Sequence, residues 1–231
     1  MDSLPPVGGS GQTLMAEDSH NFALATGVVI LAAGASTRMG RPKMLLPWGA
    51  TSLLGHLIGQ WRGIQARQIA VVVAAGADAI ASELDRIGFS ARHRIRNPEP
   101  EKGMFSSIQH AAAWDGWDAL LTHFVIVLGD QPHLSSETLQ AISRFASAHR
   151  GNICQPARRG RPRHPVVLPA EIFRQLAVAP VEDMRQFLRM NADRVALCEL
   201  EDDGLDLDID APADYERVRS LYAAGGPGNS H

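Results

Sequence analysis

Two basic side chains follow a loop of small residues near the beginning of the chain. The apolar run 28–31 passes into a loop centred on Gly34, and Arg38 and Lys43 come soon after. Small residues let backbone N–H groups approach a ligand closely. Fixed positive charges beside such a loop suit the oxygens of a polyphosphate. The pattern therefore predicts a site for a phosphate-bearing ligand, and a plain strand-to-helix turn with surface cations is the alternative.

Two common phosphate-binding motifs are excluded at this loop. A Walker A loop requires Gly before its lysine and Ser or Thr after it, whereas Lys43 lies between Pro42 and Met44. The glycine spacing of a dinucleotide-binding fingerprint is also missing.

A carboxylate follows another apolar run. Asp130 comes directly after residues 124–128, in the sequence Gly-Asp-Gln-Pro that ends at Pro132. Mg²⁺ prefers hard oxygen ligands and is usually held by one or two carboxylates together with substrate phosphates. Asp130 is therefore a candidate metal ligand, although turn geometry alone also favours Asp at such a position.

A second acidic segment lies near the end of the chain. Residues 205–210 alternate Leu or Ile with Asp, which predicts an extended strand with Asp206, Asp208 and Asp210 on one face. Carboxylates this close repel each other unless a cation or solvent screens them. The alternative is a solvated edge strand in which Asp210 caps the helix that begins near Pro212.

Two further segments could contact substrates. Gly103 and Ser107 lie at a predicted helix start, where backbone and hydroxyl groups can bond a base or ribose; a simply capped helix is the alternative. Residues 158–164 are densely basic and suit an anionic second substrate, or else form a solvated basic face.

These segments require an alternating arrangement of strands and helices. We expect strands at 28–31, 69–74, 91–96, 124–128, 152–156, 166–168 and 195–199, and those at 28–31, 69–74 and 124–128 are continuous apolar runs. Helical spacing lies at 53–61, 77–87, 104–111, 135–149 and 212–221, and two short helices precede residue 195. Such alternation predicts a mostly parallel sheet with helices on both faces. Ligands of such sheets bind at the carboxyl ends of the strands, so the Gly34 loop and Asp130 are expected to meet.

Composition restricts the function further. The net charge of -3 gives no reason to expect a nucleic acid or an anionic membrane as partner. No apolar run approaches the roughly 20 residues of a membrane span, no secretory signal begins the chain, and the two cysteines form no metal-binding spacing. We expect a cytoplasmic protein with one domain at 26–223, a flexible leader at 1–25 and a tail at 224–231.

Residues 31–43 match the pattern L-A-A-G-x-S-x-R-M-G-x-x-K, which resembles the signature of the GT-A type nucleotidyltransferases, in particular the molybdenum-cofactor group. The Gly-Asp-Gln-Pro sequence and the Asp-Ile-Asp at 208–210 are similar to further segments of that group. The resemblance implies a three-layer α/β/α Rossmann-like fold. It implies nucleotide contacts from Leu31, Ala32, Ala33, Gly34, Arg38, Lys43, Gly103, Ser107 and Asp130. Arg38, Lys43 and Asp130 would be catalytic, and Asp130 and Asp210 would hold Mg²⁺, with Asp208 as the reserve ligand.

The resemblance also implies an acceptor side formed by Arg163, His164 and Arg185. Here the chain departs from the family: Arg163 stands where the family has Gly, and the glycines before Arg185 are missing. Because the guanylyl-transferring branch tends to have Gly where this chain has Ala33, the resemblance favours CTP. The expected reaction joins CTP to molybdopterin or its molybdenum form and releases pyrophosphate, and a molybdoenzyme would receive the product. Another phosphorylated acceptor, such as a sugar phosphate or methylerythritol phosphate, or a non-catalytic cofactor-binding role, are the alternatives.

Overall fold

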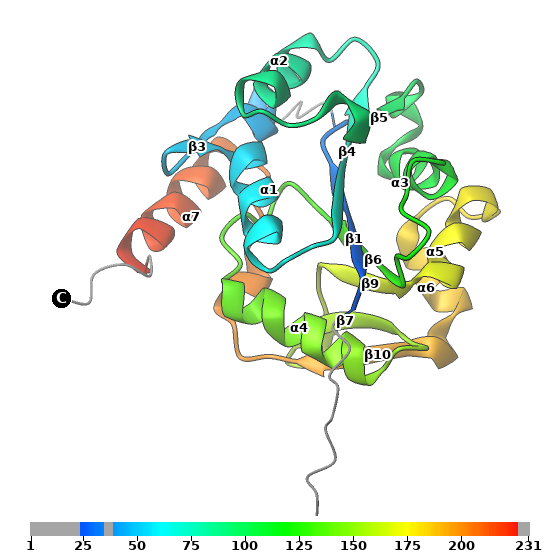
Figure 1. Ribbon diagram of the computed structural model, residues 1–231. Helices are drawn as coiled ribbons and strands as arrows, with labels where there is room; N and C mark the ends of the chain where they lie inside the picture. The colour runs from blue at the N-terminus through cyan, green and yellow to red at the C-terminus, as the bar shows by residue number, and fades with distance from the viewer. Residues whose placement is uncertain (1–23, 35–38, 226–231) are drawn as a thin grey trace, which may run out of the picture.

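The protein is seen in a computed structural model that describes residues 24–34 and 39–225, with side chains described to residue 221. The main sheet of this described part has eight strands (Figure 1). They are β1 (Thr26–Leu31), β4 (Gln68–Ala74), β5 (Arg94–Asn97), β6 (His123–Val127), β7 (Ile153–Arg158), β8 (Arg161–Pro162), β9 (Val166–Pro169) and β10 (Val195–Glu199). A separate ribbon consists of β2 (Pro47–Trp48) and β3 (Thr51–Ser52). Most of the expected leader and tail lies outside the described residues.

The sheet is mostly parallel, as the sequence predicts. Its order is β10-β7-β9-β6-β1-β4-β5, with β8 paired to β7. Strands β1, β4, β5 and β6 run parallel, as do β7 and β10, whereas β9 is antiparallel to both of its neighbours. The chain moves from β1 to β4 and β5 on one side and then returns to place β6 on the other side of β1. The carboxyl ends of β1 and β6 therefore border the point where the strand order reverses, which is where such sheets bind ligands.

Helices cover both faces of the sheet (Figure 1). The helices are α1 (Leu53–Gly63), α2 (Asp78–Arg86), α3 (Met104–Ala113), α4 (Ser136–Ala148), α5 (Ala170–Gln175), α6 (Met184–Met190) and α7 (Pro212–Gly225). Alternate residues of β1 face opposite layers: Val28 and Ile30 pack with α1, α2 and α4, and Val29 packs with α3, α5 and α6. This alternation of apolar residues explains why β1 is a continuous apolar run in the sequence.

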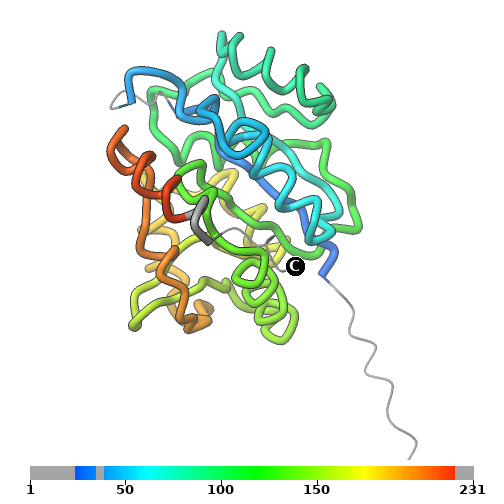
Figure 2. The backbone as a smooth tube through the Cα atoms, turned by 90° about the vertical axis from the view of Figure 1, so that its left-hand side faces the viewer, coloured from blue at the N-terminus to red at the C-terminus, as the bar shows by residue number. Residues whose placement is uncertain are grey.

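The last helix packs beside the segment that follows the first loop. Tyr215 and Val218 of α7 share a small apolar core with Leu46, Trp48 and Ile209. The Tyr215 hydroxyl also donates a hydrogen bond to the carbonyl of Pro47. Figures 1 and 2 both show α7 beside the β2–β3 ribbon. The segment after the first loop and the last helix thus pack together on one side of the molecule.

The acidic segment 205–210 is not a strand, so this prediction is wrong. Residues Asp203–Asp206 form a 3₁₀ turn, and no strand follows before α7. The Asp202 carboxylate accepts a hydrogen bond from the Gly204 N–H at 2.8 Å, which stabilises a turn in place of a strand ladder. Asp206, Asp208 and Asp210 consequently do not share one face of a strand.

Candidate active site

The first loop and Asp130 meet at the carboxyl ends of β1 and β6. A cavity of about 290 Å³ is lined by residues 31–34, Lys43, Gly103, Ser107 and Asp130, together with neighbouring residues. The structure therefore brings together the predicted nucleotide-binding residues that it describes. Arg38 lies outside the described residues, so its position relative to this cavity stays a prediction.

A second cavity extends the first one away from Asp130. It has a volume of about 410 Å³ and shares Ala32–Gly34 and Lys43 with the first cavity. Its remaining wall includes residues 74–77 at the end of β4 and Glu101, which precedes α3. The two cavities together form a cleft with a wall of small residues, where backbone groups are accessible to a ligand.

The start of α3 is held by a side chain that sequence reasoning did not single out. Asn97 is fully buried, and its Nδ2 donates hydrogen bonds of 2.9 Å to the hydroxyls of Ser106 and Ser107. Its Oδ1 accepts from the Glu99 N–H at 2.8 Å. Gly103 precedes the helix with φ +89°, a conformation that favours glycine. Asn97 therefore places Ser107 and the loop of Gly103 at the cavity wall. In the sequence, Asn97 and Pro98 indicate only the end of a strand.

Asp130 is a half-buried carboxylate in an electrostatically unfavourable position. Its Oδ1 has no hydrogen-bond partner among the described residues. Burial raises the pKa of this carboxyl, Lys43 opposes that rise, and the nearby charges of Asp208 and Asp210 add to it. The Lys43 Nζ lies 4.0 Å from Asp130 Oδ2. A single lysine at this distance does not offset the burial, so an additional cation would be stabilised at Asp130.

The acidic segment is attached to the same place through its backbone. The Ile209 N–H donates to the Asp130 carbonyl at 3.0 Å, and the Ile209 carbonyl accepts from Lys43 Nζ at 2.9 Å. Asp208 Oδ1 accepts from Gln131 Nε2 at 2.9 Å. The Asp210 N–H donates to the Asp214 carboxylate at 3.3 Å. Both Asp208 and Asp210 therefore lie near Asp130; Gln131 bonds the side chain of Asp208, whereas Asp214 bonds the backbone of Asp210.

A third cavity opens on the other side of Asp130. It has a volume of about 1110 Å³, and Asp130, Arg163, His164 and Arg185 all contribute to its wall. The structure thus gathers the three predicted acceptor residues around one space. Asp130 lines both this cavity and the 290 Å³ cavity, and together with Met104 and Leu128 it lies where the two cavities meet.

The charges of this third cavity differ from a simple basic surface. Arg163 Nε donates to Asp206 Oδ1 at 2.9 Å, so part of the Arg163 charge is neutralised inside the protein. The pKa of His164 is lowered to about 4, mainly by burial; the Asp208 charge opposes this shift and the Arg185 charge adds to it. His164 is therefore neutral near pH 7 and serves as a polar but uncharged part of the wall.

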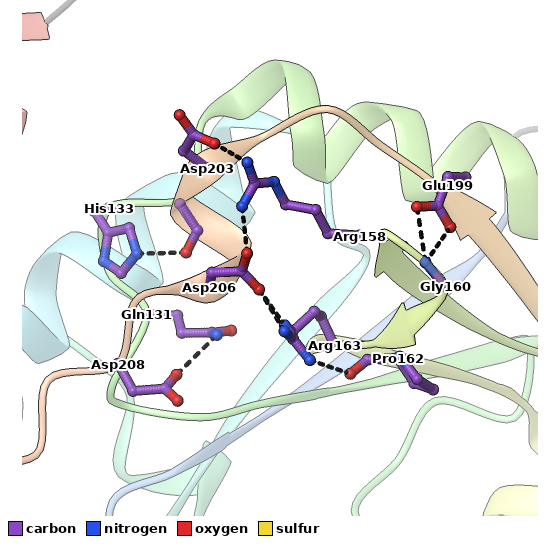
Figure 3. Close-up of polar contacts among 11 residues, drawn as sticks. Gln131, His133, Arg158, Gly160, Pro162, Arg163, Glu199, Asp203, Asp206 and Asp208 are labelled. Atoms are coloured by element: carbon purple, nitrogen blue, oxygen red, sulfur yellow. Dashed lines mark hydrogen bonds and ion pairs between the residues drawn. The ribbon is translucent and has the colours of Figure 1, made fainter.

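The basic segment 158–164 does not act as one unit. Arg158 is buried and forms ion pairs with Asp203 and Asp206 (Figure 3). The expectation that this cluster as a whole suits an anionic substrate is therefore corrected for Arg158. The sequence carries no local signal for the difference, because the two aspartates lie 45 and 48 positions further along the chain.

The donor set at Asp130 fits a divalent cation only together with a ligand. Within residues 24–34 and 39–225, no group of three or more His, Cys, Asp or Glu side chains is placed to hold a metal ion. Asp130 nevertheless has an unpaired buried oxygen beside the carboxylates of Asp208 and Asp210. Mg²⁺ and similar ions commonly bind through one or two carboxylates and complete their coordination with substrate phosphates and water.

The fold and the cleft define a nucleotidyltransferase-type α/β protein. The chain belongs to the MobA-like NTP transferase family, whose domain matches residues 28–195. It is 30% identical over 196 residues to the molybdenum cofactor cytidylyltransferase of Escherichia coli (strain K12). The aligned residues cover 84% of this chain and 95% of that relative. The family and fold expected from the sequence motifs are thereby confirmed.

Solved structures agree with this fold. A homologue of Mycobacterium tuberculosis Rv0371c from Mycobacterium sp. strain JC1 is 26% identical and has a TM-score of 0.66, over 87% of this chain and 98% of that chain. The manganese complex of Rv0371c itself is 22% identical, with a TM-score of 0.62 over 85% of this chain and 98% of that chain. Separately, no helix in the described residues is both long and apolar enough to cross a membrane.

Proposed function

We propose that this protein transfers a cytidylyl group from CTP to the terminal phosphate of a molybdopterin-type acceptor. An acceptor phosphate oxygen forms a bond to the α-phosphorus, and the bond from that phosphorus to the bridging oxygen of the β-phosphate breaks. Pyrophosphate leaves with the electron pair of the broken bond. The acceptor phosphate is already anionic, so no protein nucleophile is needed.

The position of Asp130 carries this proposal. Asp130 lines both the cavity of the first loop and the larger cavity beyond it, so a triphosphate in one and an acceptor in the other would meet beside its carboxylate. Lys43, and Arg38 in the proposal, neutralise charge that develops on the departing pyrophosphate. The cleft orients the α-phosphate, and alignment of the reacting groups contributes to the rate.

Mg²⁺ is the proposed cofactor. Asp130 would hold it with Asp210, or with Asp208, whose charge acts more strongly on Asp130 than that of Asp210 does. When bound, such an ion screens the negative charges of the phosphates that must approach each other. That one structural neighbour was solved with manganese supports divalent-metal use. Binding of Mn²⁺ in the presence of CTP, compared between Asp208→Asn and Asp210→Asn, identifies the second ligand as the residue whose change weakens binding more.

The choice of CTP and of a pterin-type acceptor rests on the relative from Escherichia coli and on Ala33 in the first loop. Because the chain differs from the family pattern at Arg163 and before Arg185, a different phosphorylated acceptor is the alternative. The volume of about 1110 Å³ favours an acceptor larger than a simple sugar phosphate.

Pyrophosphate release tests the proposal. The protein is incubated with Mg²⁺, molybdopterin and each of CTP, GTP, ATP and UTP, with Asp130→Asn as the inactive control. We expect release with CTP alone. Release only with GTP would overturn the cytidylyl assignment, and release only with a sugar phosphate or methylerythritol phosphate would overturn the acceptor. No release with any pair would favour a non-catalytic role in binding the cofactor.

A further inference from the structure

Arg158 lies at the end of β7, and its guanidinium group joins two aspartates of the turn that precedes Asp208. Its Nη2 pairs with Asp203 and its Nη1 with Asp206 (Figure 3). The Arg158 side chain is 10% exposed and the Asp206 side chain is 33% exposed, so water screens this pair less than it screens surface pairs, whereas the Asp203 side chain is 87% exposed. Arg158 contributes to the wall of none of the three cavities described above. Its position therefore does not suit direct contact with a substrate.

The same turn is held from other sides as well. The Thr138 hydroxyl at the start of α4 donates to the Asp202 carboxylate. His133, which follows the Asp130 loop, has its Nε2 2.9 Å from the Gly204 carbonyl. The turn at 202–206 thus connects to α4, to the loop after β6 and to β7. Arg158 is the member of this set that supplies a buried positive charge among the acidic side chains.

The turn determines where the next residues stand. Asp208 is two residues beyond Asp206, a distance of at most about 7 Å along the chain. Asp208 bonds Gln131, and the Ile209 N–H bonds the Asp130 carbonyl. A displaced Asp206 would therefore move the carboxylate of Asp208 and the backbone contact to Asp130. Arg163, which lines the third cavity, also donates a hydrogen bond to Asp206, so Asp206 contacts both Arg158 and the wall of that cavity.

We propose that Arg158 is a positioning residue: by holding Asp203 and Asp206 it fixes Asp208 and Ile209 against Asp130, and so sets the affinity of the site for a divalent cation bound with a nucleotide. This inference rests on the proposed function for its ligand. Arg158 acts only through the aspartates, and lysine cannot replace it fully because one ammonium group does not match two carboxylates in the way that a planar guanidinium does.

Mn²⁺ binding tests the inference without relying on turnover. Free Mn²⁺ is measured by electron paramagnetic resonance during titration of the protein in the presence of CTP. We expect Arg158→Ala and Asp206→Asn each to weaken Mn²⁺ binding roughly 10-fold or more, the range found for residues that orient metal ligands. Arg158→Lys should give an intermediate loss. Unchanged binding in Arg158→Ala, or no Mn²⁺ binding by the wild type, would overturn the inference.

Arg94 provides a matched control for loss of stability. Its side chain is 14% exposed and pairs with Asp85, which is 70% exposed, at the far edge of the sheet on β5. The melting temperatures of Arg94→Ala and Arg158→Ala should both fall, whereas only Arg158→Ala should weaken Mn²⁺ binding. Equal weakening in both variants would show a general stability effect instead. The proposed function is judged separately, by pyrophosphate release from the wild type, so either idea can fail while the other stands.

Discussion

Lys43 donates a hydrogen bond from its Nζ to the carbonyl of Ile209 at 2.9 Å, across 166 positions of the chain. The N–H of the same Ile209 donates to the carbonyl of Asp130. One residue thus joins the cation of the first loop to the loop that carries Asp130. Lys43 therefore has a structural role in addition to the phosphate-binding role expected of it.

Replacing Lys43 should consequently reduce both activity and stability. In Lys43→Met we expect kcat/KM for cytidylyl transfer to fall by about 10²-fold or more, because one preorganised charge at the leaving group is lost. The free energy of unfolding should fall by about 1–2 kcal/mol, since a charge-assisted hydrogen bond is removed. Turnover assays and urea denaturation measure the two effects. Arg41→Met, which changes an exposed cation of the same loop, should alter neither, and similar losses in both variants would contradict this double role.

Asp130→Asn should separate activity from stability. We expect kcat to fall by about 10²–10³-fold, because an electrostatic group at the reacting centre is neutralised. The pKa of the Asp130 carboxyl is higher in the folded protein than in the unfolded chain, so the protonated carboxyl stabilises the fold at low pH. This stabilisation is lost as the pH rises from the ordinary pKa of Asp through the raised pKa of the folded state. At pH 8 the ionised group therefore destabilises the protein. The urea midpoint of Asp130→Asn at pH 8 should be equal to or above that of the wild type, and a clearly lower midpoint would argue against this account.

Gly103→Ala should disturb the start of α3. The residue has φ +89° and ψ 179°, which only glycine adopts without strain, although its surroundings offer space for a methyl group. We expect a loss of about 1–3 kcal/mol in unfolding free energy and a raised KM for CTP. Gly59→Ala in α1 is the control: it also has open space, and it should stabilise the protein by up to about 1 kcal/mol. Equal effects at both glycines would show that backbone conformation at Gly103 is unimportant.

His164 should make stability depend on pH. Its pKa is lowered to about 4, so between pH 6.5 and pH 4 the unfolded chain binds a proton that the fold excludes. Stability contributed by neutral His164 is therefore lost as the pH falls through this window. Between pH 7.5 and pH 5 the wild type should lose about 2 kcal/mol more unfolding free energy than His164→Gln. Urea denaturation at a series of pH values measures this difference, and parallel curves for the two proteins would contradict it.

Much of the fold could be predicted from local patterns. Apolar runs identified β1, β4 and β6, because strands buried on both faces need apolar side chains on both sides. The meeting of the Gly34 loop with Asp130 followed from parallel topology, since both loops leave the sheet at carboxyl ends that neighbour each other. The family resemblance depended on residue order alone and needed no coordinates.

The acidic segment shows where this reasoning ends. Alternation of Asp with Leu and Ile predicted a strand at 205–210, but side-chain bonds to Asp202 and Asp206 hold a turn there. A two-residue period describes only the preference of an isolated segment, and it contains no information on partners that arrive from β7 or α4. Asn97 was missed for the same reason, because its role lies in two serines that the folded chain brings to it.

The sequence by itself determined the buried strands β1, β4 and β6, the loop of small residues after β1 and the family, because these depend on side-chain character and spacing along a short stretch. Tertiary structure alone decided which arginine faces a cavity and which is buried. Arg158 and Arg163 are close in sequence and chemically identical, yet Arg158 is buried and pairs with Asp203 and Asp206, while Arg163 reaches the wall of the third cavity. The physical reason is that an ion pair is set by the distance between charges in space, which long-range packing fixes.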